Sequence, residues 1–305
     1  MSTIVELLRA RAARVSRAPH GDGARIALCV EGGAMRGVVS AGMVSALEEL
    51  GLVDSFDNVY GSSAGAINAA YFLAGQAAFG TTIYAEDINN SRFISLPRLL
   101  TGRPIVDLGF LIDEVATRRK PLNTARVLAS PSPLTVMATS VDTAARAPLT
   151  AFPDGAALML ALRAGATMPV LAGPAVTYAG RRYLDASLTE PIPVTLAEEE
   201  GHTHVLALLT RPSDSPRATT MFDRLYVLPR LRRLSPALAT LYVDRGARYR
   251  QLLDSIGAGR GPLGRADVLG VRPLPPVVGK LERSSSTLKS AARLGFDAVM
   301  RAFGQ

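Results

Sequence analysis

Short apolar runs alternate with longer amphipathic segments through most of the chain. The short runs are rich in aliphatic residues and end near glycine or polar turns, which is typical of buried strands, whereas the longer segments place apolar residues at helical spacing. The predicted strands cover residues 25–33, 56–61, 134–143 and 204–212, and the predicted helices cover residues 38–52, 63–75 and 157–168. Strands that alternate with helices indicate an α/β fold with a mainly parallel sheet covered on both faces.

A hairpin and a terminal pair of elements complete this pattern. Residues 175–185 predict a hairpin that turns near Gly180. Residues 268–277 predict a further strand, and residues 284–304 predict a helix capped by one of its serines. The domain is therefore predicted to end in a strand and a helix.

The N-terminal segment differs from the body in being basic. Residues 1–18 predict an amphipathic helix that places Ile4, Leu7, Leu8 and Val15 on one side. The predicted domain organisation is a helical extension at residues 1–24 and a single domain at residues 25–305, with a basic excursion at about 211–265.

Positive charge is concentrated in two segments. The 305 residues are 48% hydrophobic and 20% charged, as in a globular protein with a sizeable core. The formal net charge is +8, and residues 1–25 carry five Arg and two acidic residues while residues 211–265 carry eleven Arg and four Asp. These segments predict either a solvated surface or peripheral contact with an anionic membrane. No nucleic-acid-binding motif accompanies the charge, so we expect no nucleic-acid partner.

The single cysteine and the apolar runs bear on the location of the protein. Cys29 lies in the predicted strand 25–33, which indicates a buried thiol and excludes both an internal disulfide and a Cys-based zinc site. Residues 1–20 lack the apolar segment of a secretory signal, and the uncharged run 58–85 holds too many glycine and polar residues for a membrane span. We expect a cytoplasmic protein, peripheral at the inner face of the membrane where its basic segments bind.

A Gly-x-Ser-x-Gly sequence stands where a predicted strand meets a predicted helix. Gly61, Ser63 and Gly65 form this motif, and a turn of this kind exposes the serine hydroxyl at a helix N-terminus, where backbone dipoles favour negative charge. The motif predicts Ser63 as a nucleophile, with Gly61 and Gly65 permitting the tight turn. The alternative is a small residue that packs a helix on a sheet. Ser62 is the neighbouring candidate, but Ser63 holds the central position.

A glycine-rich loop follows the first predicted strand. In the sequence EGGAMRG, from Glu31 to Gly37, successive backbone N–H groups can point at one anion. As a dinucleotide-binding motif it is weak, because a glycine would be needed where Ala34 stands. The nearby Gly-x-Ser-x-Gly turn favours an oxyanion hole. Arg36 either adds positive charge to this hole or pairs with a carboxylate at the helix edge.

A serine nucleophile needs a base. His202 and His204 lie at the entry of a predicted strand, which is the end of the sheet opposite the strand-to-helix turns, and we expect them to be solvated or supporting residues. Asp185 ends the predicted hairpin beside small residues. From the residues alone it is either an ordinary turn aspartate or an acceptor that reaches across to Ser63.

The order of these elements resembles the patatin-like phospholipase family, particularly its bacterial branch. Four stretches resemble family counterparts in the right order: EGGAMRGVVSAGM, GSSAGAINAAYFLAGQ, ALRAGATMPVLAGPA and RRYLDASLTEPIPV. The correspondence runs from about Arg25 to Pro212. It continues more loosely through LLDSI and the C-terminal tail.

This resemblance implies a three-layer α/β/α fold and hydrolysis of lipid acyl esters, with phospholipid or lysophospholipid as substrate. It implies that Ser63 is the nucleophile and Asp185 its base, and that neither a metal nor a cofactor takes part. The oxyanion hole it implies comprises Gly32, Gly33 and Ala34, with Arg36 nearby.

Two positions depart from the family's usual pattern. Ala34 replaces the third glycine of the oxyanion loop, and Ala186 follows Asp185 where the family usually has glycine. Where the backbone takes a positive φ, a Cβ costs on the order of 1 kcal/mol or shifts the loop. The alternative hypothesis is therefore a lipid-binding or regulatory protein with impaired catalysis.

Overall fold

The computed structural model describes the chain apart from residues 1–2, 15–19, 170, 213–218 and 277. The described residues form a sheet in the order β5-β6-β3-β2-β1-β7-β8, with β4 pairing with β3. Strands β3, β2, β1, β7 and β8 are parallel, whereas β4, β5 and β6 join by antiparallel pairing. The strands are β1 (Ile26–Val30), β2 (Asn58–Ser62), β3 (Leu134–Ser140), β4 (Arg146–Leu149), β5 (Val176–Tyr178), β6 (Arg181–Asp185), β7 (His204–Leu208) and β8 (Asp267–Val271).

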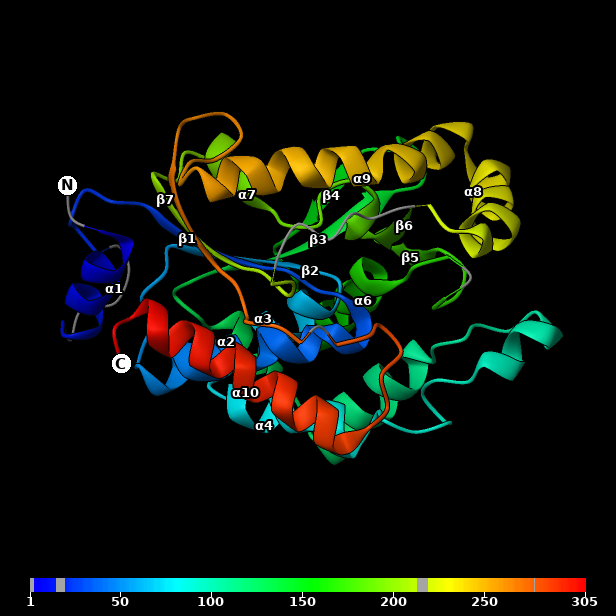
Figure 1. The fold of residues 1–305 in the computed structure, drawn as a ribbon, viewed down its shortest axis with the longest axis horizontal. Coiled ribbons are helices and arrows are strands. Elements are labelled where there is room, and N and C mark those ends of the chain that lie inside the picture. The colour runs from blue at the N-terminus through cyan, green and yellow to red at the C-terminus, as the bar shows by residue number, and fades with distance from the viewer. Residues whose placement is uncertain (1–2, 15–19, 170, 213–218, 277) are drawn as a thin grey trace.

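Helices cover both faces of this sheet, which confirms the predicted three-layer α/β/α fold (Figure 1). The α-helices are α1 (Ile4–Ala12), α2 (Val38–Glu49), α3 (Ala64–Leu73), α4 (Ala77–Glu86), α5 (Thr124–Leu128), α6 (Gly155–Ala166), α7 (Val194–Glu199), α8 (Leu228–Leu234), α9 (Pro236–Gly257) and α10 (Ser285–Ala302). The 3-10 and π-helical segments are η1 (Ala34–Gly37), η2 (Leu96–Thr101), η3 (Phe110–Arg119), η4 (Ala186–Leu188) and η5 (Asp223–Val227). Figure 1 shows α7 and α9 over one face, and α2, α3, α4 and α10 over the other.

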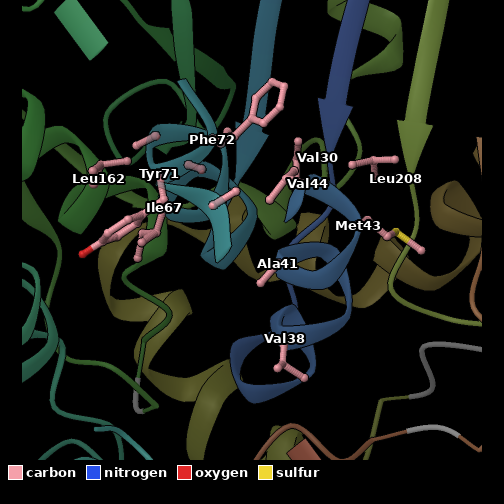
Figure 2. Packing of buried hydrophobic residues seen from close by; sticks show 14 of the residues in the cluster. Val30, Val38, Ala41, Met43, Val44, Ile67, Tyr71, Phe72, Leu162 and Leu208 are labelled. Atoms are coloured by element: carbon pink, nitrogen blue, oxygen red, sulfur yellow. The ribbon is translucent and has the colours of Figure 1, made fainter. Parts of the chain in front are cut away.

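The central strands β1 and β7 are almost entirely apolar because alternate residues enter two different cores. Leu28 and Val30 of β1 belong to the large cluster beneath α2, α3 and α10, whereas Ala27 and Cys29 belong to the cluster beneath α7 and α9. Figure 2 shows side chains of α2 beside Val30 and the end of β7 in the large cluster. The uninterrupted hydrophobic runs in the sequence therefore reflect burial on both faces, and Cys29 is the buried thiol that the sequence predicts.

The predicted terminal elements and hairpin are present with small changes. Strands β5 and β6 turn through Ala179 and Gly180, both at positive φ, and Ser284 caps α10 by accepting from the Thr287 N–H. The N-terminal helix is shorter than predicted, since α1 ends at Ala12 and Val15 lies outside the described residues. No helix in the described part of the chain has the length and apolarity needed to cross a membrane.

Candidate active site

Ser63 lies at the junction of β2 and α3 in a backbone conformation that residues other than glycine rarely adopt. Its φ is 56° and its ψ is −131°, whereas the residues on either side continue the strand and begin the helix. Its hydroxyl makes no capping hydrogen bond to the helix, and the residue is only partly buried. A strained strand-to-helix turn that holds a serine above a sheet is the geometry of a nucleophile elbow.

Two glycines make this turn sterically possible. A Cβ at Gly61 would lie 2.3 Å from the Cα of Ala66, and one at Gly65 would lie 2.3 Å from the carbonyl oxygen of Val30. Both distances are well inside van der Waals contact, and both clashes are with backbone. The motif therefore requires glycine at these two positions to bring the helix against β1 and β2.

The neighbouring serine has a different environment. The hydroxyl of Ser62 is buried and donates to the carbonyl oxygen of Glu190 at 3.0 Å. Burial raises the pKa of the Glu190 carboxyl above its ordinary value, although the Leu196 N–H and Arg146 oppose this rise. Ser62 thus anchors the β2 end to the segment after η4. Both serines line the pocket described below, but the Ser62 hydroxyl is engaged with Glu190, whereas the Ser63 hydroxyl does not cap α3.

The glycine loop packs directly against this elbow. A Cβ at Gly32 would lie 2.4 Å from the carbonyl oxygen of Ser62 and 2.9 Å from the Cβ of Ser63, so only glycine permits this approach. Gly33 and Ala34 follow with φ of 155° and 54°. Within the described residues, the N–H groups of Gly32, Gly33 and Ala34 donate to no protein acceptor. These donors are therefore available to an anion beside Ser63.

A buried carboxylate that the sequence pattern did not single out anchors the loop. Glu31 accepts from the backbone N–H of Thr210 at 2.7 Å and from the hydroxyl of Tyr249 at 2.7 Å. The Thr210 hydroxyl lies 3.0 Å from both the Glu31 carboxylate and the carbonyl oxygen of Gly32. In the sequence, the only sign of a role for Glu31 is a charged residue at the end of an apolar strand. Its partners could not be identified there, because they lie about 180 and 220 residues further along the chain.

Arg36 is folded beneath the glycine loop. Its Nε donates to the Thr210 hydroxyl at 3.3 Å, and its guanidinium lies 3.3 Å from the position of a Cβ on Gly33. The side chain is buried and also lines the pocket. Its positive charge is therefore close to the loop that the sequence predicts as an oxyanion hole.

Asp185 ends β6 and approaches the elbow across one intervening strand. In the sheet register Ser62 pairs with Met137 of β3, and the next residue of β3, Ala138, pairs with Asp185. Ser63 and Asp185 thus flank β3, two strand spacings or about 10 Å apart at the backbone. Asp185 is buried, and its carboxylate accepts from the Ser187 N–H at 2.8 Å.

Within the described residues, no hydrogen bond joins Asp185 to Ser63. Catalytic hydrogen bonds are often long in ligand-free sites and shorten when substrate binds. Ala186, which follows Asp185, is not among the residues at positive φ, so its Cβ introduces no backbone strain. Of the two departures from the family pattern, only Ala34 occupies a conformation that favours glycine.

The histidines lie away from this site, as the sequence predicts. His204 begins β7 and pairs with Ile26, the first residue of β1, at the amino edge of the parallel strands. His202 is buried at the same edge, where its Nδ1 lies 3.0 Å from the carbonyl oxygen of Ala197, and burial lowers its pKa. His20 is also buried, and none of the three lines the pocket around Ser63.

One pocket of about 450 Å³ brings the predicted site residues together. Its walls include Gly32, Gly33, Ala34, Arg36, Ser63 and Asp185. This volume is within the range of pockets that hold small organic ligands. No group of three or more metal-ligating side chains occurs in the part of the chain that the structure describes.

The pocket has an apolar part and a charged part. The apolar walls come mainly from α3, α4, residues 88–111 and the segment after α6, and include Ile67, Tyr71, Ile83, Tyr84, Ile88, Phe93, Val106, Leu108, Leu111, Met168, Leu171 and Ala172. The charged walls are Glu31, Arg36, Arg211, Asp223, Arg245 and Lys280. Sequence reasoning did not find these walls, because they are contributed by segments far apart in the chain.

The chain is similar to one protein-family model, to one bacterial protein and to one crystal structure. The family model for patatin-like phospholipase matches residues 28–198. The uncharacterized protein YjjU of Escherichia coli strain K12 is 27% identical over 253 residues, which cover 82% of this chain and 70% of YjjU. The crystal structure of VipD from Legionella pneumophila aligns with a TM-score of 0.48 and 10% identity, over 92% of this chain and 66% of that one. The chain thus spans just under two thirds of the length of the VipD chain.

Proposed function

Because the chain belongs to the patatin-like phospholipase family, we propose that it is a serine hydrolase that cleaves acyl esters of lipids through Ser63 and Asp185. Membership of this family supports lipid acyl hydrolase activity in general. The observation that carries the finer proposal is the strained Ser63 turn, which packs against a glycine loop with free N–H donors and shares a pocket with Asp185.

In the first half of the proposed reaction, Asp185 accepts the Ser63 proton as Oγ attacks the ester carbonyl. The carbonyl oxygen becomes an oxyanion, which the N–H groups of Gly32, Gly33 and Ala34 stabilise together with the positive end of α3. The C–O bond to the alcohol then breaks, and the alcohol leaves with the proton held by Asp185. The product that remains is an acyl ester of Ser63.

In the second half, water attacks the acyl-enzyme. Asp185 now accepts a proton from water, and the same N–H groups stabilise the second oxyanion. The bond between Ser63 Oγ and the acyl carbon then breaks, Asp185 returns its proton to Oγ, and the fatty acid is released. Both half-reactions use the same two side chains and the same donors. The mechanism therefore needs only groups that this chain supplies.

The pocket walls favour a lipid as the substrate. A long apolar lining beside Ser63 suits an acyl chain, since burying each methylene stabilises the complex by about 0.8 kcal/mol. The arginines on the charged side suit an anionic group such as a phosphate. We therefore propose phospholipid or lysophospholipid as the substrate class.

Kinetics of matched serine variants test the proposal. Purified protein is assayed on short-chain nitrophenyl esters and on lysophospholipid, with Ser63→Ala, Asp185→Asn and Ser62→Ala. Ser63→Ala should abolish turnover, and Asp185→Asn should lower kcat by about 10²–10⁴-fold, as for loss of a general base. Ser62→Ala is the control that keeps the elbow. Equal activity in the wild type and Ser63→Ala would exclude Ser63 as the nucleophile.

A second candidate function is lipid binding without efficient turnover. The observation that favours it is Ala34, whose φ of 54° carries a Cβ at a position where the family usually has glycine. A fluorophosphonate probe distinguishes the two functions, because it labels only a serine that has a working base and oxyanion hole. Slow labelling of Ser63 that Ala34→Gly accelerates would support impaired catalysis, whereas rapid labelling of the wild type would support the hydrolase.

A further inference from the structure

Exposed apolar side chains gather on two segments at one end of the molecule. On η2, Leu96 is 60% exposed and Leu100 is 90% exposed. On and just before η5, Met221 is 70% exposed and Leu225 is 61% exposed. Large aliphatic side chains this exposed are costly in water unless something covers them.

The two segments lie near each other and beside the pocket. Figure 1 shows α8 and the segment that carries η2 extending from the same end of the long axis. Leu99 of η2 packs against the large core cluster and also against the cluster formed by η5, α8 and α9. Phe93 and Val106, at the base of the η2 segment, line the pocket, as do Phe222 and Val227 at η5. The segments that carry the exposed residues therefore also contribute walls to the pocket that contains Ser63.

The charges between these apolar residues are positive on the outer surface. Residues 91–106 contain no Asp or Glu, and residues 219–235 contain only Asp223. Asp223 is turned inward, where it accepts from the Tyr242 hydroxyl at 2.5 Å and pairs with Arg245 at 3.1 Å. The exposed arginines of these two stretches are Arg92, which pairs with Glu114, and Arg103, Arg224, Arg230, Arg232 and Arg233. An apolar tip bordered by arginines is complementary to a bilayer that has anionic headgroups.

We propose that this end of the molecule, formed by η2 (Leu96–Thr101) and the segment from Met221 to Leu234, docks on an anionic lipid bilayer. Leu96, Leu100, Met221 and Leu225 enter the headgroup region, and the arginines bind lipid phosphates. The pocket then opens toward the bilayer, so that a lipid chain passes from membrane to pocket with little exposure to water.

The N-terminal segment takes no part in this docking. Helix α1 lies at the opposite end of the long axis from α8 (Figure 1). Arg11 is buried in ion pairs with Asp22 and Asp57, and Arg9 donates to the carbonyl oxygen of Phe303. Of the two basic segments in the sequence, the docking surface therefore uses the one at 211–265, together with η2.

Vesicle co-sedimentation tests this proposal without depending on hydrolysis. Ser63→Ala protein is mixed with vesicles of equimolar phosphatidylglycerol and phosphatidylcholine, and separately with phosphatidylcholine alone. We expect binding to the anionic vesicles that weakens as salt is raised to about 0.5 M, because screening then shortens the reach of the arginines. Absence of binding to anionic vesicles at low salt overturns the proposal.

Matched surface variants locate the contact. Leu100→Asp with Leu225→Asp should weaken binding at least tenfold, and Arg232→Glu with Arg233→Glu should weaken binding to anionic vesicles most. Leu263→Asp is the control, since Leu263 is 42% exposed but lies in the loop after α9. If the control and the docking variants lose vesicle binding equally, the proposal is overturned. It is also overturned if the protein forms a concentration-dependent dimer that Leu100→Asp abolishes, because the exposed leucines would then bind a second copy of the chain.

Turnover of a soluble short-chain ester separates docking from chemistry. None of the four substituted docking residues lines the pocket, so the docking variants made with Ser63 intact should hydrolyse the soluble ester at the wild-type rate. Their hydrolysis of vesicle phospholipid should fall with binding. Loss of soluble-ester turnover in these variants would contradict the assignment of these residues to docking alone.

Discussion

The backbone of Ser63 is strained by its own side chain. Its φ of 56° and ψ of −131° lie in a region that costs a residue with a Cβ about 1–3 kcal/mol. The surrounding contacts hold it there. Gly32, Gly61 and Gly65 each lack a Cβ and so allow a neighbouring backbone segment to pack closely against the turn. The hydroxyl thereby stands clear of the helix that follows it. Stability is lost at this residue so that the hydroxyl can face the pocket.

Ser63→Gly should therefore make the protein more stable while it removes the nucleophile. We expect the free energy of unfolding to rise by about 1 kcal/mol, because glycine adopts this conformation without strain. Urea unfolding at pH 7 measures the change. The control is Ser45→Gly within α2, which should destabilise by about 0.5–1 kcal/mol, since glycine is unfavourable in a helix. A less stable Ser63→Gly protein would mean that the turn is unstrained.

Single residues also show what the sequence could and could not predict about the site. Ser63 and the glycine loop both follow predicted parallel strands, and the carboxyl ends of parallel strands meet at one edge of a sheet, so their convergence could be predicted. Asp185 ends a strand that is antiparallel to β3, so its place in the same pocket depends on the sheet register. Glu31 could not be assigned its role, because the partners that bury its carboxylate are distant in the chain. The conformation of Ala34 also depends on the folded loop, not on local preference.

At the scale of elements, α2 and α10 pack at unusually close range. A Cβ on Gly42 would lie 1.9 Å from the carbonyl oxygen of Ala292, and one on Gly295 would lie 2.0 Å from the carbonyl oxygen of Val39. Each helix thus places a glycine against the backbone of the other. Because α2 begins directly after the glycine loop, this contact also fixes the position of η1.

Gly295→Ala should separate these two helices. The added methyl group meets backbone, which cannot turn away, so we expect a loss of about 1–3 kcal/mol of stability. Urea unfolding measures it, with Gly257→Ala at the end of α9 as the control. No atom lies within 4 Å of a Cβ at Gly257, so that variant should be neutral or more stable. Equal stability of the two variants would contradict the close packing.

The order of the central strands and their helices could be predicted because burial on both faces makes strands such as β1 and β7 almost continuously apolar. The pairing of α2 with α10 could not be predicted, because a glycine in a helix indicates close packing but does not identify the element that packs against it. The π-helical turns of η3 and η5 likewise lack a signature in the apolar spacing.

Across the whole molecule, α1 is tied to the body by a buried arginine. Arg11 pairs with Asp22 through Nε and with Asp57 through Nη1, each at 2.8 Å. Asp57 also accepts from the backbone N–H of Ile26, where β1 begins. The sequence suggests a basic surface for this segment, yet Arg11 is buried because two carboxylates compensate its charge.

Acid should weaken this connection over a defined range. The Arg11 hydrogen bonds lower the pKa of Asp22 from 3.8 to about 2. A carboxyl whose pKa is lowered by folding stabilises the fold above its unfolded pKa, and this stability is lost as the pH falls from about 4 to about 2. Asp22→Asn should therefore lower the free energy of unfolding at pH 7 by about 2 kcal/mol and remove this part of the acid sensitivity.

Urea unfolding between pH 7 and pH 2 measures this effect, with the exposed Asp267→Asn as the control. The control should retain the wild-type loss of stability below pH 4. If Asp22→Asn and the wild type lose stability in parallel, the Arg11–Asp22 pair does not stabilise the fold.

The site of covalent modification shows whether Ser63 is the nucleophile and Asp185 its base. Wild type, Ser62→Ala, Ser63→Ala and Asp185→Asn are each treated with a fluorophosphonate, and the adduct is located by peptide mass spectrometry. We predict one adduct on Ser63 in the first two proteins, none in Ser63→Ala, and labelling slowed by about 10²-fold or more in Asp185→Asn. An adduct on another residue, or equal labelling rates with and without Asp185, would contradict this prediction.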